Sequence, residues 1–278
     1  MIRTVRPLLS ALALVLTLPA SADIARLPTA SPVPGGVALV PVPTSQASLK
    51  GRPVMVVSAK GTRYAEHAPW LAVVGIDLST EPGTLALNAG TQTISFEVKD
   101  KQYREQRLTI KNKRHVNPEK RDMERIGRER KEMLTALGNW RDDNAPVTRF
   151  ELPARGPFSS PFGLKRFFND QPRAPHSGLD IAAPKGAPIT APAPGVVTAA
   201  GDYFFNGRNV VLDHGHGLVT MYSHLDRIDV SVGDRVKTGD SLGTIGNSGR
   251  VTGPHLHWTV SLNNVRVDPM LFIDPPAK

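Results

Sequence analysis

The segment GPHLHW, residues 253–258, places two histidines on either side of one leucine in a stretch that reads as a β-strand. Side chains alternate between the two faces of a strand, so His255 and His257 must share one face while Leu256 points to the other. Two buried imidazoles side by side would each need hydrogen-bond partners. The segment therefore favours a β fold in which this face carries a metal or a reaction that uses two imidazoles.

The chain around this segment shows short β-like runs joined by glycine turns. Examples are RNVVLDHG (208–215), GLVTMYSHL (217–225) and HLHWTVSL (255–262). Runs of this length with turn residues between them indicate strands. We therefore predict an antiparallel β domain over residues 149–278. Four prolines confine one part of it to loops or sheet edges: Pro184, Pro188, Pro192 and Pro194.

Histidines gather in the same region. In the segment HSGLD, His176 and Asp180 would lie about 13 Å apart on an extended chain. They can share a metal only if the backbone bends between them, and Gly178 lies where a bend is easiest. Six of the eight histidines lie between residues 176 and 257: His176, His214, His216, His224, His255 and His257.

Three segments of this region, in order, resemble the signatures of the lysostaphin-type (LytM-like) zinc endopeptidases. They are HSGLDIAAPKGAPITAPAPGVV, NVVLDHGHGLVTMYSHL and VGDRVKTGDSLGTIGNSGRVTGPHLHW, which contain an H-x-x-x-D, a Y-x-H-L and an H-x-H motif. The resemblance covers roughly residues 155–272. It implies a β-rich fold, one catalytic Zn²⁺ per chain, and cleavage of peptide cross-links or stem peptides in peptidoglycan. A D-Ala to diaminopimelate bond is the default target, with carboxypeptidase action and cleavage of glycine bridges as the alternatives.

The resemblance also implies a role for each residue of the motifs. His176, Asp180 and His257 would bind zinc, while His224 and His255 would act in catalysis. Two imidazoles and one carboxylate leave an open position for water, as a catalytic zinc requires. One imidazole can then accept a proton while the other, protonated, stabilises developing negative charge. Which histidine does which stays open.

Four other polar residues in the same region are weaker candidates for the site. We expect a structural or supporting role for His214 and an exposed turn position for His216. Asp213 is a candidate to orient a ligand histidine, and Asn209 is a candidate to line the cleft.

Three other interpretations compete with a zinc peptidase. Two histidines and a carboxylate also describe the site of non-haem iron oxygenases, but that class does not explain His224 and His255. A non-catalytic activator of cell-wall amidases, or a scaffold of the same fold, would not need all five positions filled. A biotinyl or lipoyl carrier domain is suggested by VGDRVKTGDSLGTIG, yet Lys237 does not match the context of the modified lysine.

The N-terminal half predicts a second β domain and a helix. Short β-rich runs between Pro53 and Ile110, the last of them YREQRLTI (103–110), indicate a β-sandwich over residues 23–112. A helix with its linker is expected over residues 113–148, with Asn117 as the N-cap and Gly138 as the stop. Its apolar residues recur at helical spacing: Met123, Ile126, Met133, Leu134 and Leu137.

The first residues indicate export. Residues 1–22 combine two arginines, a short apolar run and an A-x-A cleavage signal, which is the pattern of a secretory signal peptide. The chain has no cysteine, so disulfides and thiolate metal ligands are excluded. We expect a periplasmic protein, with no membrane span after cleavage and no lipid anchor, and a monomer.

The net charge of +9 is concentrated in one stretch. Residues 99–131 contain 13 Lys or Arg against 6 Asp or Glu. In an exported protein this favours an anionic envelope polymer or a membrane surface over nucleic acid as a partner. The alternative is a solvated helix face whose charges have no partner. Two hypotheses follow for the N-terminal part. It either covers the cleft and restrains the enzyme, or recruits the enzyme to peptidoglycan through the basic stretch.

Overall fold

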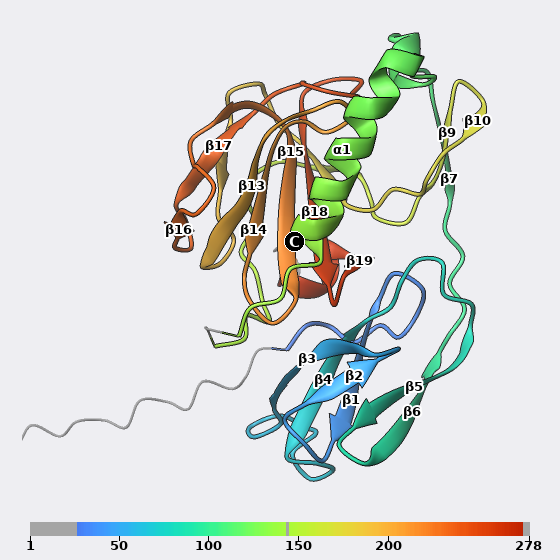
Figure 1. Ribbon diagram of the computed structural model, residues 1–278, viewed down its shortest axis with the longest axis vertical. Coiled ribbons are helices and arrows are strands. Elements are labelled where there is room, and N and C mark those ends of the chain that lie inside the picture. Colours follow the sequence, from blue (N-terminus) through green and yellow to red (C-terminus); the bar gives the residue numbers. More distant parts are fainter. Residues whose placement is uncertain (1–26, 143–144, 275–278) are drawn as a thin grey trace, which may run out of the picture.

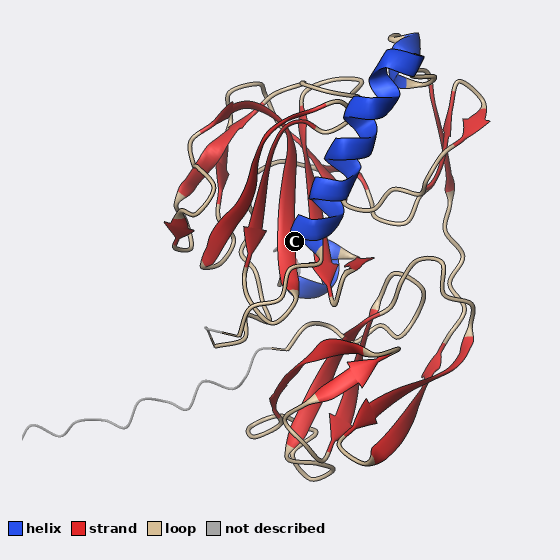
Figure 2. Cartoon of the chain, viewed as in Figure 1, coloured by secondary structure: helices blue, strands red, loops and turns tan. Residues whose placement is uncertain are grey.

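The computed structural model describes residues 27–142 and 145–274, and it is mainly β (Figures 1 and 2). A smaller β part occupies one end of the molecule and a larger β part the other, with one long helix lying across the larger part. The predicted mainly β fold is confirmed. The signal peptide predicted over residues 1–22 lies outside the described residues.

The N-terminal part is an antiparallel sheet in the order β1-β4-β3-β2-β5-β6 that folds back on itself. Its end strands β1 and β6 approach each other, so the sheet encloses a small core that includes Val42, Val74 and Leu87. This is the expected sandwich-like arrangement. Its strands are β1 (Val37–Val42), β2 (Ala47–Leu49), β3 (Arg52–Ser58), β4 (Trp70–Gly75), β5 (Gly83–Ala89) and β6 (Gln92–Val98).

The C-terminal part is a larger sheet in the order β16-β13-β14-β15-β18-β11-β8, with β12 and β17 paired beside it and β19 on β18. Its long central strands bury Leu212, Tyr222 and Trp258 completely. The strands are β8 (Phe158–Ser160), β11 (Leu179–Ala182), β12 (Pro188–Thr190), β13 (Gly195–Tyr203), β14 (Gly207–Asp213), β15 (Leu218–Ile228), β16 (Arg235–Val236), β17 (Ser241–Ile245), β18 (His255–Leu262) and β19 (Val265–Val267), and the 3-10 helix η2 (Pro269–Phe272) follows.

A third, small sheet joins the two parts. Strand β7 (Glu105–Leu108) pairs in parallel with β9 (Lys165–Phe168), which pairs in turn with β10 (Gln171–Pro172). The expectation that this stretch belongs to the N-terminal sandwich is therefore wrong. The reason is packing, because Leu108 and Ile110 bury against Phe168 of the larger part, together with Val116.

Helix α1 (Lys120–Leu137) follows the short 3-10 helix η1 (Lys113–His115) and crosses β13, β14 and β15. It stops at Gly138, as predicted, but the N-cap is Glu119 and not Asn117. The carboxylate of Asp122 decides the start. It accepts a hydrogen bond from the Glu119 backbone N–H at 3.0 Å and two from the guanidinium of Arg114.

The helix buries less of its apolar face than the sequence pattern suggests. Leu137 and Ala136 are buried against Val211, Val219 and Met221 of the sheet. Met123 and Leu134 remain 54% and 47% exposed. Among the described residues, no helix is both long and apolar enough to cross a membrane.

The two β parts also touch directly. The Gly75 backbone N–H at the end of β4 donates to the Asn263 side-chain oxygen at 3.1 Å, in the turn between β18 and β19. Apolar residues of β1, β3 and β4, among them Val37 and Met55, belong to the same buried cluster as the core of the larger sheet. The N-terminal part is thus packed on the larger part and joined to it by a strand.

Candidate metal centre

Strand register brings the motif residues together. In β18, His257 lies opposite Asp180 of β11 on one side and opposite Ser223 of β15 on the other. Residues directly opposite each other share a face of the sheet. The face that carries His257 therefore also carries Asp180. Leu256 points the other way into the core and is fully buried, as the alternation in GPHLHW predicts.

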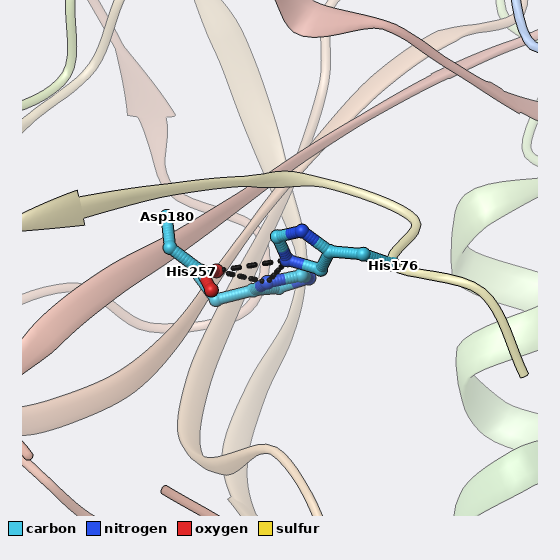
Figure 3. A group of neighbouring side chains, drawn as sticks. All are labelled: His176, Asp180 and His257. Atoms are coloured by element: carbon cyan, nitrogen blue, oxygen red, sulfur yellow. Dashed lines mark hydrogen bonds and ion pairs between the residues drawn. The ribbon is translucent and has the colours of Figure 1, made fainter. Parts of the chain in front are cut away.

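Three ligand atoms converge at this point (Figure 3). The Nε2 atom of His176 lies 2.9 Å from Oδ1 of Asp180 and 3.0 Å from Nδ1 of His257. The last pair, His257 Nδ1 and Asp180 Oδ1, is 2.7 Å apart. His176 and Asp180 are buried, and His257 is nearly so.

The donor set of this cluster fits a divalent cation. Nδ1 of His176 lies 2.7 Å from the Pro161 carbonyl oxygen, which only accepts, so this nitrogen carries the proton. In the neutral ring of His176, Nε2 then carries a lone pair that faces a carboxylate oxygen of Asp180 and a ring nitrogen of His257. Acceptors crowded in this way repel one another unless a cation lies between them. Two imidazoles and a carboxylate are a ligand set that zinc uses in catalytic sites.

The surroundings of His257 and Asp180 favour the protonation states in which these side chains can bind a metal. Burial lowers the pKa of His257 to about 4, against the opposing effect of Asp180, so the ring is neutral at pH 7. Burial raises the pKa of Asp180, but the adjacent imidazoles of His176 and His257 outweigh this and hold the pKa well below its usual range. Neutral imidazoles and an ionised carboxylate are the forms that bind metal.

Gly178 makes room for the site. A β-carbon at this position would lie 2.7 Å from Cε1 of His257 and 2.6 Å from the Trp258 carbonyl oxygen. The sequence suggested that this glycine permits a bend. The structure shows a need for space instead, because the ring of His257 occupies the place of a side chain.

His224 and His255 lie beside the cluster of His176, Asp180 and His257, and the two rings are held by hydrogen bonds of the same kind. The ring centroids of His224 and His255 are 4.9 Å apart, and those of His224 and His257 are 6.0 Å apart. Each ring bonds a backbone carbonyl through Nδ1, His224 to Ser248 and His255 to Gly253, both at 2.9 Å. A carbonyl only accepts, so Nδ1 is protonated in both rings and Nε2 is left as the reactive nitrogen.

His224 reaches this face through an irregular backbone. Ser223 pairs with His257, so its neighbour would point to the opposite face in a regular strand. The φ angle of His224 is +70° and the register of β14 and β15 shifts at this point, which turns the ring toward the site. A non-glycine residue in this conformation costs about 1–2 kcal/mol. Such outliers gather at functional sites.

Asp180 is held from outside by residues that the sequence motifs do not include. A guanidinium nitrogen of Arg166 donates to Oδ2 of Asp180 at 3.1 Å, which leaves Oδ1 for the cluster. The Nε atom of Arg166 donates to the side-chain oxygen of Gln106 at 3.1 Å, and the Gln106 amide donates to Ser160 at 2.7 Å. Gln106 belongs to β7, so the segment between the two β parts supports a candidate metal ligand.

Two hollows of about 420 and 350 Å³ flank the cluster. His224, His257, Arg166 and Arg250 line both of them. Helix α1 forms one wall of the larger hollow through apolar residues that include Met133 and Leu134. The smaller hollow is lined by residues of β7 and by the loop before His255.

Two of the remaining candidates serve the fold. His214 is fully buried, with Nδ1 on the Pro194 carbonyl at 2.7 Å and Nε2 on Thr220 at 2.8 Å, and burial lowers its pKa to about 4. This agrees with the structural role expected for it. His216 is not the exposed turn residue that we predicted, because it packs against Trp140 with 18% of its side chain exposed.

Asp213 and Asn209 also differ from their expected roles. The carboxylate of Asp213 accepts from Arg141 at 2.9 Å and from Asn139 at 2.7 Å, and so it anchors the chain after α1 instead of a ligand histidine. Asn209 is fully buried and does not line either hollow. It accepts a hydrogen bond from Ser223, which lines the larger hollow.

Comparisons with known proteins agree with this geometry. The model of peptidase family M23 matches residues 174–269, and the model of the peptidase family M23 N-terminal domain matches residues 30–101. The chain is 43% identical over 103 residues to the peptidoglycan DD-endopeptidase ShyC of Vibrio cholerae, which covers 37% of this chain and 24% of that protein. It is 38% identical over 112 residues to the DD-carboxypeptidase/endopeptidase Mpg of Neisseria meningitidis, covering 40% of this chain and 26% of that protein. The chain thus spans about a quarter of the length of these relatives.

One solved structure matches nearly the whole chain. It is a crystal structure assigned to peptidase M23 from Pseudomonas aeruginosa, with 42% sequence identity and a TM-score of 0.70. The match covers 87% of this chain and 95% of the other. This near-complete coverage at high identity, with the two matching family models, shows that the chain belongs to peptidase family M23.

Proposed function

We propose that this protein is an exported, zinc-dependent endopeptidase that hydrolyses peptide cross-links or stem peptides of peptidoglycan. The D-Ala to diaminopimelate bond is the proposed target. The observation that carries the proposal is the convergence of His176, Asp180 and His257 on one point, beside two further imidazoles whose Nδ1 atoms bond backbone carbonyls. Relatives named peptidoglycan endopeptidases support the choice of substrate.

In this proposal, Nε2 of His176, Oδ1 of Asp180 and Nδ1 of His257 would hold one zinc ion. Such an ion would supply Lewis acidity for the scissile carbonyl and for a water molecule. The Pro161 carbonyl and Arg166 fix the orientation of the ligands from outside. Partners of this kind set the tautomer and direction of metal-binding side chains.

His224 and His255 are the proposed catalytic residues. The carbonyl oxygens of Ser248 and Gly253 hold their Nδ1 protons, so each ring presents Nε2 for proton transfer. One ring accepts a proton from the attacking water, and the other, in its protonated form, donates to the oxyanion or to the leaving amine. The two assignments remain alternatives.

The site and domain assignments extend to the whole chain. We propose a signal peptide over residues 1–22, an N-terminal β domain over 23–102, a linking region over 103–148 that includes β7 and α1, and the catalytic domain over 149–278, with the mature monomer in the periplasm. A non-catalytic amidase activator or scaffold is the alternative. The presence of all five side chains in one cluster disfavours it.

Digestion of purified sacculi followed by mass spectrometry of the released fragments tests this function. The proposal predicts fragments with cleaved peptide bonds, their loss after treatment with a chelator, and their return with added zinc. The His255→Ala variant should release none. If the folded, zinc-loaded protein releases fragments only when an amidase is added, the activator alternative is correct.

A further inference from the structure

Arg250 lies at the site but takes no part in the mechanism above. It follows β17 in the loop that leads to His255, and it lines both hollows beside the metal cluster. Its guanidinium carbon lies 4.4 Å from the ring centroid of Phe205 and 4.8 Å from that of Phe168. The two rings and a contact of 3.4 Å with the His115 carbonyl oxygen fix the head group in place.

The charge of Arg250 is not compensated by the protein. Three other arginines of the larger part and its linking region have carboxylate partners: Arg114 bonds Asp122, Arg141 bonds Asp213 and Arg166 bonds Asp180. Within the described part of the chain, no carboxylate forms an ion pair with Arg250. Burial, together with the smaller effects of the nearby cations Arg166 and Arg173, lowers its pKa to about 10.

The surrounding hollow is cationic as a whole. The larger hollow is lined by four arginines and one carboxylate, Glu129, which already accepts from the Phe204 backbone N–H and from Arg125. A partly buried cation without a counter-ion is costly unless a ligand supplies the opposite charge. Guanidinium groups held rigidly in this way bind carboxylates with two parallel hydrogen bonds.

We propose that Arg250 is a specificity-determining residue that binds a free carboxylate of the peptide substrate next to the scissile bond. This inference rests on the proposed function and adds the charge that the substrate must carry. Stem peptides that contain diaminopimelate present such a carboxylate. The rings of Phe168 and Phe205 hold the guanidinium in its binding position before the substrate arrives, which reduces the entropy lost on binding.

The test compares a soluble cross-linked stem peptide with the same peptide after its free carboxylates are converted to carboxamides. The wild-type protein should cleave the carboxylate form with a kcat/KM at least about 30-fold higher, the lower range for losing one partner of a desolvated charge pair. In Arg250→Met, kcat/KM for the carboxylate form should fall to that of the amide form. Arg250→Met should cleave the amide form with nearly the same kcat/KM as the wild-type protein does, and it should bind the same amount of zinc.

Two further variants separate recognition from general effects. Arg250→Lys keeps the charge but loses the planar fork, so it should retain part of the discrimination. Arg227→Met removes a positive charge that is paired with Asp229 and lies outside both hollows, and it should leave the discrimination intact.

Each failure has a distinct meaning. If the wild-type protein cleaves both peptides equally well, no carboxylate is recognised and the inference is overturned, even when the Arg250 variants do not fold. If Arg250→Met loses kcat/KM equally on both peptides, the role of Arg250 is structural, and the inference is again overturned. If the wild-type protein cleaves neither peptide and no sacculus fragments appear, the proposed function itself has failed.

Discussion

The walls around the two hollows beside the metal cluster come from different parts of the chain and are built in different ways. One wall is the face of the large sheet, where the register of β11, β15 and β18 sets Asp180 and Ser223 on either side of His257. The other wall comes from the linking region, through Gln106 of β7 and the apolar side of α1. The sheet wall carries the proposed catalytic and metal-binding groups, whereas the linking region supports a proposed ligand through Arg166 and lines both hollows. The two walls should therefore respond very differently to substitution.

Substitutions on the sheet wall should have the largest effects. His257→Ala should abolish zinc binding and activity, because one of three protein ligands is lost. His255→Ala should abolish activity while zinc is largely kept, because its Nε2 is 3.9 Å from Asp180 and it is assigned to proton transfer. Metal analysis of the two folded variants checks this. Equal loss of zinc in both would show that the separation into ligands and catalysts is wrong.

The next effect concerns the support that the linking region gives to the sheet wall. Gln106→Ala removes the acceptor for Nε of Arg166 and so loosens the contact of Arg166 with Asp180. We expect zinc affinity to weaken by about tenfold, the lower range for such outer partners. Competition with a chromophoric chelator measures it. The exposed Gln102, changed to Ala, is the control, and equal affinities in both variants would show that Gln106 does not support the site.

A smaller effect is expected from α1, and it separates restraint from recruitment. Glu129 and Glu132 tie the helix to the hairpin after β13, through the Phe204 N–H at 2.8 Å and the Tyr203 hydroxyl at 2.5 Å. If α1 restrains access, the double change to Gln should speed hydrolysis of a soluble muropeptide by a few-fold. If the basic stretch recruits the enzyme, that rate should be unchanged, and binding to intact sacculi should weaken as salt increases. Both hypotheses fail if the double variant hydrolyses the muropeptide at the wild-type rate and binding to sacculi does not change with salt concentration.

The smallest effect is a pH dependence at the start of α1. The bonds from Arg114 lower the pKa of Asp122, with burial opposing them, so the folded protein holds this carboxylate ionised more strongly than the unfolded chain does. The resulting stability is present above the unfolded pKa and is lost as pH falls through the lower folded value. Asp122→Asn should therefore lose less stability on acidification below about pH 4 than the wild type. Thermal unfolding at several pH values measures this, with Asp100→Asn as the control, and parallel curves for Asp122→Asn and wild type would contradict it.

The same comparison explains which features the sequence predicts. Alternation alone placed His255 and His257 on one face with Leu256 in the core, because the period of a strand is local information. The pairing of Asp180 with His257 depends on register between strands 77 residues apart, which no local pattern contains. Only the resemblance to a known family could assign those roles.

The features that the sequence missed depend on tertiary contacts. The stretch around Gln106 has the alternation of any exposed strand, so its pairing with β9 in place of the sandwich could not be inferred. Asn117 is a good capping residue, but Arg114 and Asp122 together move the helix start to Glu119. The positive φ of His224 follows from a register shift that leaves no mark on the sequence.

The coordination of zinc in the full-length protein tests the central claim most directly. We predict that a crystal structure of the zinc-loaded protein shows the ion bound by Nε2 of His176, a carboxylate oxygen of Asp180 and Nδ1 of His257, with the Nε2 atoms of His224 and His255 left unbound. A zinc ion coordinated by His224 or His255 in place of one of these ligands would contradict the account.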